Sequence, residues 1–241
     1  MKRKAILFDL DGTLLPQDQD IFVKAYFKLL AVKMAPRGYA PDALIKAIWH
    51  GTEAMIKNTG KKTNEEVFWD DFSAIFGENA RQEKEHLDDF YAHEFFGARE
   101  SCAFNPLVPK VIAKLKETGY RLILATNPIF PLIAVESRLQ WAGLSPDDFE
   151  YITSYENAHY TKPNPAYYQE ILENTGLLPQ DCLMVGNDVR DDGAAGKLGI
   201  PVFFLTDCLI NQEKRDLEDS PHGDFVALME YLDGEGNNAN D

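Results

Sequence analysis

Short apolar runs recur along the chain, and each has the length of a buried strand. They cover residues 5–8, 122–125, 183–185 and 202–205, with a weaker run at 151–153. Runs that are apolar at every position are typical of parallel strands with helices on both faces of the sheet. Helical periodicity fills the stretches between the later runs, and a glycine lies just beyond each: 107–117, 131–141, 165–174 and 191–198. The alternation predicts an α/β fold with a doubly wound parallel sheet.

One long stretch, residues 16–99, contains no convincing strand. Its apolar residues follow a helical spacing, which predicts helices over 20–34, 41–58 and 78–96. The sequence Thr63-Asn64-Glu65-Glu66 is a capping box, which predicts the start of another helix. We therefore expect an all-helical cap domain at 16–99, inserted into an α/β core formed by residues 1–15 and 100–241. Four aromatic residues of this insert are interpreted as its own core: Trp49, Trp69, Phe72 and Phe76.

Composition narrows the classes of partner. The 241 residues are 45% hydrophobic, which suits one large domain or a domain with an insertion. The 39 acidic and 24 basic residues give a net charge of −15, which disfavours nucleic acids and anionic membranes as partners. No apolar window approaches the ~18 residues of a membrane span. The 3 cysteines are far apart and odd in number, which argues against a disulfide framework. We expect a cytoplasmic protein, with its oligomeric state open.

Polar side chains follow the predicted strands. Ligands of open parallel sheets bind at the carboxyl ends of the strands, so residues placed there are candidates for a common site. The candidates lie in separate loops: Asp9, Asp11, Thr126, Asn127, Lys162, Asp188 and Asp192.

The pair of aspartates at the end of the first strand requires compensation. Two unit charges ~4 Å apart repel by about 4 kcal/mol at an effective dielectric constant of about 20. Asp9 and Asp11 therefore indicate a metal, a shared proton, or a nucleophile with its acid partner. If Asp188 and Asp192 converge with them, four carboxylates need a divalent cation, and an oxygen ligand set favours Mg²⁺. A hydroxyl, an amide and a lysine suit a small tetrahedral anion.

Four segments, in this order, resemble the motifs of the haloacid dehalogenase superfamily of hydrolases. The insert between the first two is similar to the family's first type (C1) of helical cap, and the resemblance implies a Rossmann-like core. The segments are Asp9-Leu10-Asp11-Gly12-Thr13, Leu124-Ala125-Thr126-Asn127, Lys162-Pro163-Asn164-Pro165 and Gly186-Asn187-Asp188-Val189-Arg190-Asp191-Asp192.

The resemblance implies a Mg²⁺-dependent phosphatase that acts on a small phosphorylated metabolite. Asp9 would attack phosphorus and form an aspartyl-phosphate, and Asp11 would protonate the leaving oxygen and then activate water. An aspartate at position 11 favours phosphatase or phosphomutase chemistry within the family.

The resemblance also assigns the remaining candidates. Thr126, Asn127 and Lys162 would hold the phosphoryl oxygens. The implied Mg²⁺ ligands are Asp9, Asp11 through its main-chain carbonyl, Asp188, and Asp192 as a ligand or a support behind the ligands. Asp191 is an alternative to Asp192, since acidic residues crowd the fourth motif.

Other interpretations stay open. The first two aspartates alone would fit a turn and a helix cap, and Lys162 alone would fit a surface lysine. Asp18 and Asp20 either lie near the entrance of the site or cap the next helix. His50 is interpreted as a surface residue, with a position facing the substrate as the alternative. At the level of function, the alternatives are a phosphosugar mutase of the same fold and, in a different class, a phospho-receiver or regulatory binding protein.

Overall fold

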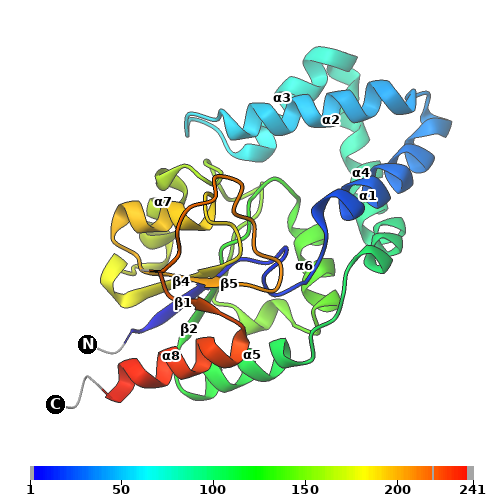
Figure 1. Ribbon diagram of the computed structural model, residues 1–241. Helices are drawn as coiled ribbons and strands as arrows, with labels where there is room; N and C mark the ends of the chain where they lie inside the picture. Colours follow the sequence, from blue (N-terminus) through cyan, green and yellow to red (C-terminus); the bar gives the residue numbers. More distant parts are fainter. Residues whose placement is uncertain (1–2, 219, 238–241) are drawn as a thin grey trace.

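The computed structural model describes residues 3–218 and 220–237 and contains a fully parallel sheet with the strand order β3-β2-β1-β4-β5-β6 (Figure 1). The strands are β1 (Ala5–Phe8), β2 (Arg121–Leu124), β3 (Tyr151–Ile152), β4 (Cys182–Gly186), β5 (Val202–Leu205) and β6 (His222–Gly223). Strand β1 pairs with both β2 and β4, so the chain's first strand lies in the middle of the sheet. The predicted α/β fold class is confirmed.

Helices cover both faces of this sheet. They are α5 (Leu107–Glu117), α6 (Leu132–Trp141), α7 (Pro165–Thr175), α8 (Phe225–Asn237) and the short 3₁₀-helices η4 (Pro146–Asp148), η5 (Pro179–Asp181) and η6 (Asp192–Leu198). Ile6 and Phe8 of β1 pack with α5, α6 and α8, whereas Ala5 and Leu7 pack with α7 and η6. Alternate residues of one buried strand therefore enter two separate cores, which explains why every position of the run is apolar.

The segment between β1 and β2 is helical, as predicted. It contains α1 (Gln19–Met34), η1 (Ala35–Arg37), α2 (Pro41–Ile56), α3 (Asn64–Phe76), η2 (Glu78–Glu83), α4 (Lys84–Ala92) and η3 (Glu94–Ser101). Helices α2 and α3 pack side by side away from the sheet, and α4 contacts α6 of the core (Figure 1). Thr63 and Glu66 form the predicted capping box at the start of α3. The division into separate cap and core domains stays a prediction.

The single helix predicted over 78–96 is wrong. The chain forms η2, α4 and η3 instead, and the backbone leaves the helical region at His93. Beyond this break the Phe95 ring lies 5.0 Å from the Trp141 ring of α6 and 5.3 Å from that of Tyr91. Aromatic packing against the core thus overrides the helical periodicity of the sequence.

The last two elements, β6 and α8, were not predicted from the sequence. Strand β6 has 2 residues, too few for a hydrophobic pattern. Within the described residues, no helix combines the length and the apolar character that crossing a bilayer requires.

Candidate active site

A cavity of about 700 Å³ lies between the carboxyl edge of the sheet and the helical segment. One side is formed by the predicted polar residues, here called the polar floor: Asp9, Asp11, Thr126, Asn127, Lys162, Asp188 and Asp192. The other side, here called the aromatic roof, is formed by rings from α1 to α4: Phe22, Tyr26, Phe27, Trp49, Phe68, Trp69 and Tyr91. The structure therefore brings together all seven residues that the strand ends singled out.

Asp9 is fixed at the end of β1. Its main-chain N–H donates to the Val185 carbonyl at 2.9 Å. One carboxylate oxygen accepts from Lys162 Nζ at 2.7 Å, and the other lies 3.1 Å from Thr13 Oγ1. The residue is only 7% exposed. Burial raises the pKa of Asp9 to about 7, although the ammonium of Lys162 acts in the opposite direction.

Lys162 is shared between two carboxylates. Its ammonium donates to Asp9 Oδ1 and to Asp192 Oδ1, both at 2.7 Å, and the side chain is buried. Burial acts to lower the pKa of Lys162, but Asp192 and Asp9 outweigh it and hold the pKa well above its ordinary value. One ammonium thus faces two buried carboxyl groups, Asp9 and Asp192.

Asp11 forms an ion pair that the sequence analysis missed. Its Oδ2 accepts from Nη1 of Arg138 in α6, and its Oδ1 is buried with no partner among the described residues. The Arg138 side chain is 1% exposed, lies 4.5 Å from the Phe130 ring centroid, and donates through Nε to the Ala134 carbonyl at 3.1 Å. A charged residue between buried apolar positions of the predicted helix 131–141 was the available signal.

Glycines allow close packing around this floor. Gly12 has a φ of +83°, and a Cβ there would lie 2.3 Å from Asn187 Nδ2. At Gly186 a Cβ would lie 2.1 Å from Asp192 Oδ2. A larger residue at Gly12 or Gly186 would displace the side chain of Asn187 or of Asp192, respectively.

The acidic residues of the fourth motif take different positions. Asp192 uses both oxygens, one for Lys162 and one for the Asp188 N–H at 2.9 Å. Asp188 Oδ1 accepts from the N–H groups of Arg190 and Asp191 at 2.8 and 2.9 Å. Burial and then the nearby Asp188 carboxylate raise the pKa of Asp191 to about 6. Both Asp191 and Asp192 line the cavity, but both oxygens of Asp192 are already bonded within the floor.

The donor set fits Mg²⁺ better than a softer metal. In the part of the chain that the structure describes, no three His, Cys, Asp or Glu side chains are grouped closely enough to hold a metal. Mg²⁺ needs few protein carboxylates, because waters and substrate oxygens complete its shell. Asp9 and Asp188 both line the cavity, and two carboxyl groups beside a single ammonium suit a divalent cation, which would favour the ionised form of Asp9.

Hydrogen bonds from neighbouring loops and from α7 hold Thr126 and Asn127 of the second motif in place. The Thr126 carbonyl accepts from Thr153 Oγ1 at 2.7 Å and from the Tyr167 hydroxyl at 2.8 Å. Asn127 Oδ1 accepts from the Lys162 N–H at 3.2 Å, so this side chain ties the loop carrying Lys162 to that carrying Thr126.

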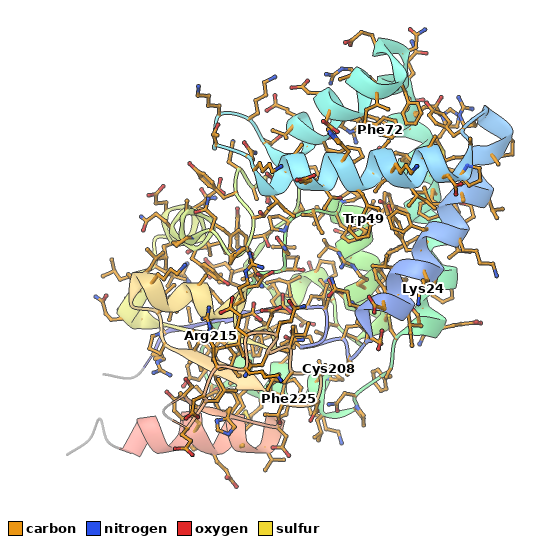
Figure 2. All side chains as sticks on the ribbon, turned by 45° about the horizontal axis from the view of Figure 1, so that its top comes forward. Lys24, Trp49, Phe72, Cys208, Arg215 and Phe225 are labelled. Carbon is orange, nitrogen blue, oxygen red and sulfur yellow. The ribbon has the colours of Figure 1, made fainter. Side chains whose placement is uncertain are left out.

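The prediction that Trp49 belongs to the core of the helical segment is wrong. Figure 2 shows Trp49 on the side of α2 that faces the sheet, whereas Phe72, a residue of α3, lies on the opposite side of α2. Trp49 is 51% exposed and lines the cavity, while Trp69 and Phe72 are buried as predicted and Phe76 is half-buried. A helical period places a ring on the inward face, but it does not distinguish packed core from a cavity wall.

The open interpretations of three other polar residues are resolved. Asp18 accepts from the Ile21 N–H at 3.0 Å and so caps α1, and it also lines the cavity together with Asp20. His50 pairs with Asp71 at 2.7 Å, and its side chain is 63% exposed, so it is a surface residue.

Comparisons with known proteins give consistent matches. A family model described as haloacid dehalogenase-like hydrolase matches residues 3–199. The phosphoglycolate phosphatase of Psychrobacter arcticus is 26% identical over 238 residues, which are 96% of this chain and 96% of that protein. The phosphoglycolate phosphatase of Vibrio vulnificus strain CMCP6 is 30% identical over 203 residues, 84% of this chain and 83% of that protein. The magnesium-bound HAD-hydrolase YfnB of Bacillus subtilis shares the fold, with a TM-score of 0.57, 17% identity, and coverage of 97% of this chain and 100% of that chain.

Proposed function

Because the chain belongs to the haloacid dehalogenase-like hydrolases, we propose that it is a Mg²⁺-dependent phosphatase that hydrolyses a small phosphorylated metabolite through a phosphorylated Asp9. The predicted enzyme class, a phosphoric monoester hydrolase, is confirmed by the family model and by the relatives named phosphoglycolate phosphatases. The observation that carries the proposal is the position of Asp9, which is held against Lys162 at the wall of a large cavity with Asp11 beside it.

Asp9 would be the nucleophile. One carboxylate oxygen attacks phosphorus, the bond from phosphorus to the leaving oxygen breaks, and the phosphoryl group is left on Asp9. Asp11 gives a proton to the leaving oxygen as that bond breaks. It then takes a proton from a water molecule that attacks phosphorus, which releases inorganic phosphate and restores Asp9.

The floor also supplies positive charge. The Lys162 ammonium is already beside Asp9, so it can stabilise negative charge on the transferred group without reorganisation. Thr126 and Asn127 would complete the oxygen contacts. Asp9, Asp188 and the Asp11 carbonyl would hold Mg²⁺, which when bound neutralises charge on the phosphoryl oxygens.

Arg138 is proposed as a positioning residue. It does not line the cavity, and it acts through Asp11, whose Oδ2 it holds while Oδ1 stays without a partner among the described residues. The fixed carboxylate can then present one oxygen to the leaving group.

The direct test is phosphate release from 4-nitrophenyl phosphate with and without Mg²⁺. We expect release that requires the metal and is lost in Asp9→Asn. An inactive wild type in the presence of Mg²⁺, or an Asp9→Asn variant as active as wild type, would overturn the proposal.

Product analysis with a sugar phosphate distinguishes the phosphatase from the alternative phosphosugar mutase. An isomer of the sugar phosphate indicates a mutase, and inorganic phosphate indicates a phosphatase.

We also propose that residues 16–99 act as a cap domain over the core. The support is that the roof comes from α1 to α4 and the floor from the strand ends. A disulfide engineered between α2 and the core should slow turnover reversibly, and full activity of the oxidised enzyme would contradict the proposal.

A cytoplasmic setting is supported by the free thiols of Cys102, Cys182 and Cys208. Recovery of the protein from native cells in an exported fraction would contradict it.

A further inference from the structure

The charges around the cavity are unevenly distributed. Among the described residues that line it, Lys162 is the one basic side chain, and it is already held between Asp9 and Asp192. Arg138 lies outside the lining, is 1% exposed, and is neutralised by Asp11. Above the floor, the wall is built chiefly of rings and aliphatic side chains, and the lining also contains Asp18, Asp20 and neutral polar side chains such as Thr52 and Gln19.

We propose that the aromatic roof binds an uncharged, apolar leaving group of about the size of an aromatic ring, and that it selects against leaving groups with a second anionic group. This inference rests on the proposed phosphatase function and names the substrate class of the same site.

The first argument is the state of the roof itself. Trp49 is 51% exposed although it lies in the wall of a cavity. Its ring is 5.5 Å from that of Phe27, while Phe68 and Trp69 meet edge to face at 5.4 Å. These contacts fix the directions of the rings. An apolar group against Trp49 would remove its surface from water, at roughly 25 cal/mol for each Å² buried.

The second argument is the cost of burying the carboxylate of an anionic leaving group against the roof. A buried carboxylate needs a cation or directed hydrogen bonds, because otherwise its desolvation is uncompensated. The roof supplies no cation among the described residues and only neutral hydrogen-bond donors, such as the buried indole N–H of Trp69, while Asp18 and Asp20 would repel the group. Phosphoglycolate, whose leaving group carries a carboxylate, is therefore a poor fit for this cavity.

The third argument concerns size and the cationic alternative. A cavity of about 700 Å³ is larger than a phosphoryl group with a two-carbon acid needs, and it lies in the range of sites that take ring-containing ligands. The aromatic rings of the roof, together with Asp18 and Asp20, are also a combination that can bind a quaternary ammonium group. Asp18 and Asp20 keep their charge in the lining, so a cationic leaving group is the competing alternative, and phosphocholine is included in the experiment to test it.

The experiment compares phosphate release from benzyl phosphate, 2-phosphoglycolate and phosphocholine, with Mg²⁺ and wild-type protein. All three have alkyl leaving groups, so leaving-group acidity contributes far less to the comparison than it would with an aryl ester. We expect kcat/KM for benzyl phosphate to exceed the other two by about tenfold or more, as is typical for filling an apolar pocket. A phosphoglycolate or phosphocholine value equal to or above that for benzyl phosphate would overturn the inference.

Variants sharpen the comparison. Trp49→Ala should narrow the ratio of benzyl phosphate to phosphoglycolate by about tenfold, and Trp49→Arg should reverse it by supplying the missing cation. Phe96→Ala is the matched control, since Phe96 is 58% exposed on the helical segment but outside the cavity lining. A ratio that stays the same in both Trp49 variants would contradict the role of the roof.

Binding separates failure of this inference from failure of the proposed function. Calorimetry on the Asp9→Asn variant with Mg²⁺ measures benzylphosphonate against phosphonoacetate. If wild type hydrolyses nothing, the phosphatase proposal falls, and binding alone decides the inference. Benzylphosphonate binding about tenfold tighter supports it, and equal or weaker binding overturns it.

Discussion

The polar floor and the aromatic roof line the same cavity but are built on opposite principles. In the floor, carboxylates, an ammonium and main-chain groups form a network of hydrogen bonds and ion pairs, in which Lys162 lies between Asp9 and Asp192 and Arg138 pairs with Asp11. In the roof, rings contact one another, and Trp49 stays half exposed. We therefore expect the floor to determine the reaction and the roof to determine which leaving groups bind.

The largest effect should come from the floor. Asp9→Asn removes the attacking oxygen and should lower kcat by at least about 10³-fold, since loss of a nucleophile is among the severest changes in an active site. The measurement is phosphate release with Mg²⁺. Asp233→Asn, an exposed residue of α8 outside the cavity lining, is the control and should retain activity. Comparable rates in both variants would remove Asp9 from the mechanism.

The second largest effect should come from Arg138, which holds Asp11 from behind the floor. Arg138→Met leaves Asp11 without its partner and should lower kcat by about 10²-fold with little change in KM. Arg138→Lys keeps the charge and should recover part of the loss. The unfolding free energy must be measured in parallel, because removal of one partner of a buried pair costs about 3–5 kcal/mol. A folded Arg138→Met variant with the wild-type kcat would contradict the positioning role.

Two tryptophans compare the roof with the core. Trp69 is 5% exposed, so Trp69→Ala should lower the unfolding free energy by about 3–5 kcal/mol. Trp49 is 51% exposed, so Trp49→Ala should lower the unfolding free energy by only about 0.5 kcal/mol. Chemical denaturation of both variants checks this difference. Equal destabilisation would mean that Trp49 is part of the packed core, as the sequence first indicated.

The smallest effect concerns Asp191. Its pKa is raised to about 6 in the folded protein, so its ionised form is disfavoured by folding. The penalty is absent below about pH 4 and complete above about pH 6. Without Mg²⁺, Asp191→Asn should therefore stabilise the protein at about pH 8 and give no gain at about pH 4. The full shift corresponds to about 3 kcal/mol, but solvent screens this partly exposed side chain, so we expect a gain of about 1 kcal/mol. Thermal unfolding in EDTA at the two pH values measures this, and a gain of equal size at both would rule out the ionisation as its cause.

The sequence was most informative where function and strand ends coincide. The run Ala5–Phe8 and the polar residues after it could be placed because a buried parallel strand is apolar throughout and its ligands lie at one edge. Arg138 could not be paired with Asp11, since the two are 127 residues apart and meet only when α6 packs on the sheet. Likewise, the break at His93 depends on tertiary aromatic contacts that periodicity does not contain.

The most direct measurement of the central claim is the covalent intermediate on the floor. In the Asp11→Asn variant, 4-nitrophenyl phosphate should still phosphorylate the enzyme, because 4-nitrophenolate leaves without a proton, while attack by water is slowed. Acid quench and peptide mass spectrometry should then find one phosphoryl group on the peptide that contains Asp9, and none in the double variant that also carries Asp9→Asn. A phosphoryl group on another peptide, or turnover by Asp11→Asn with no phosphorylated peptide, would contradict the account.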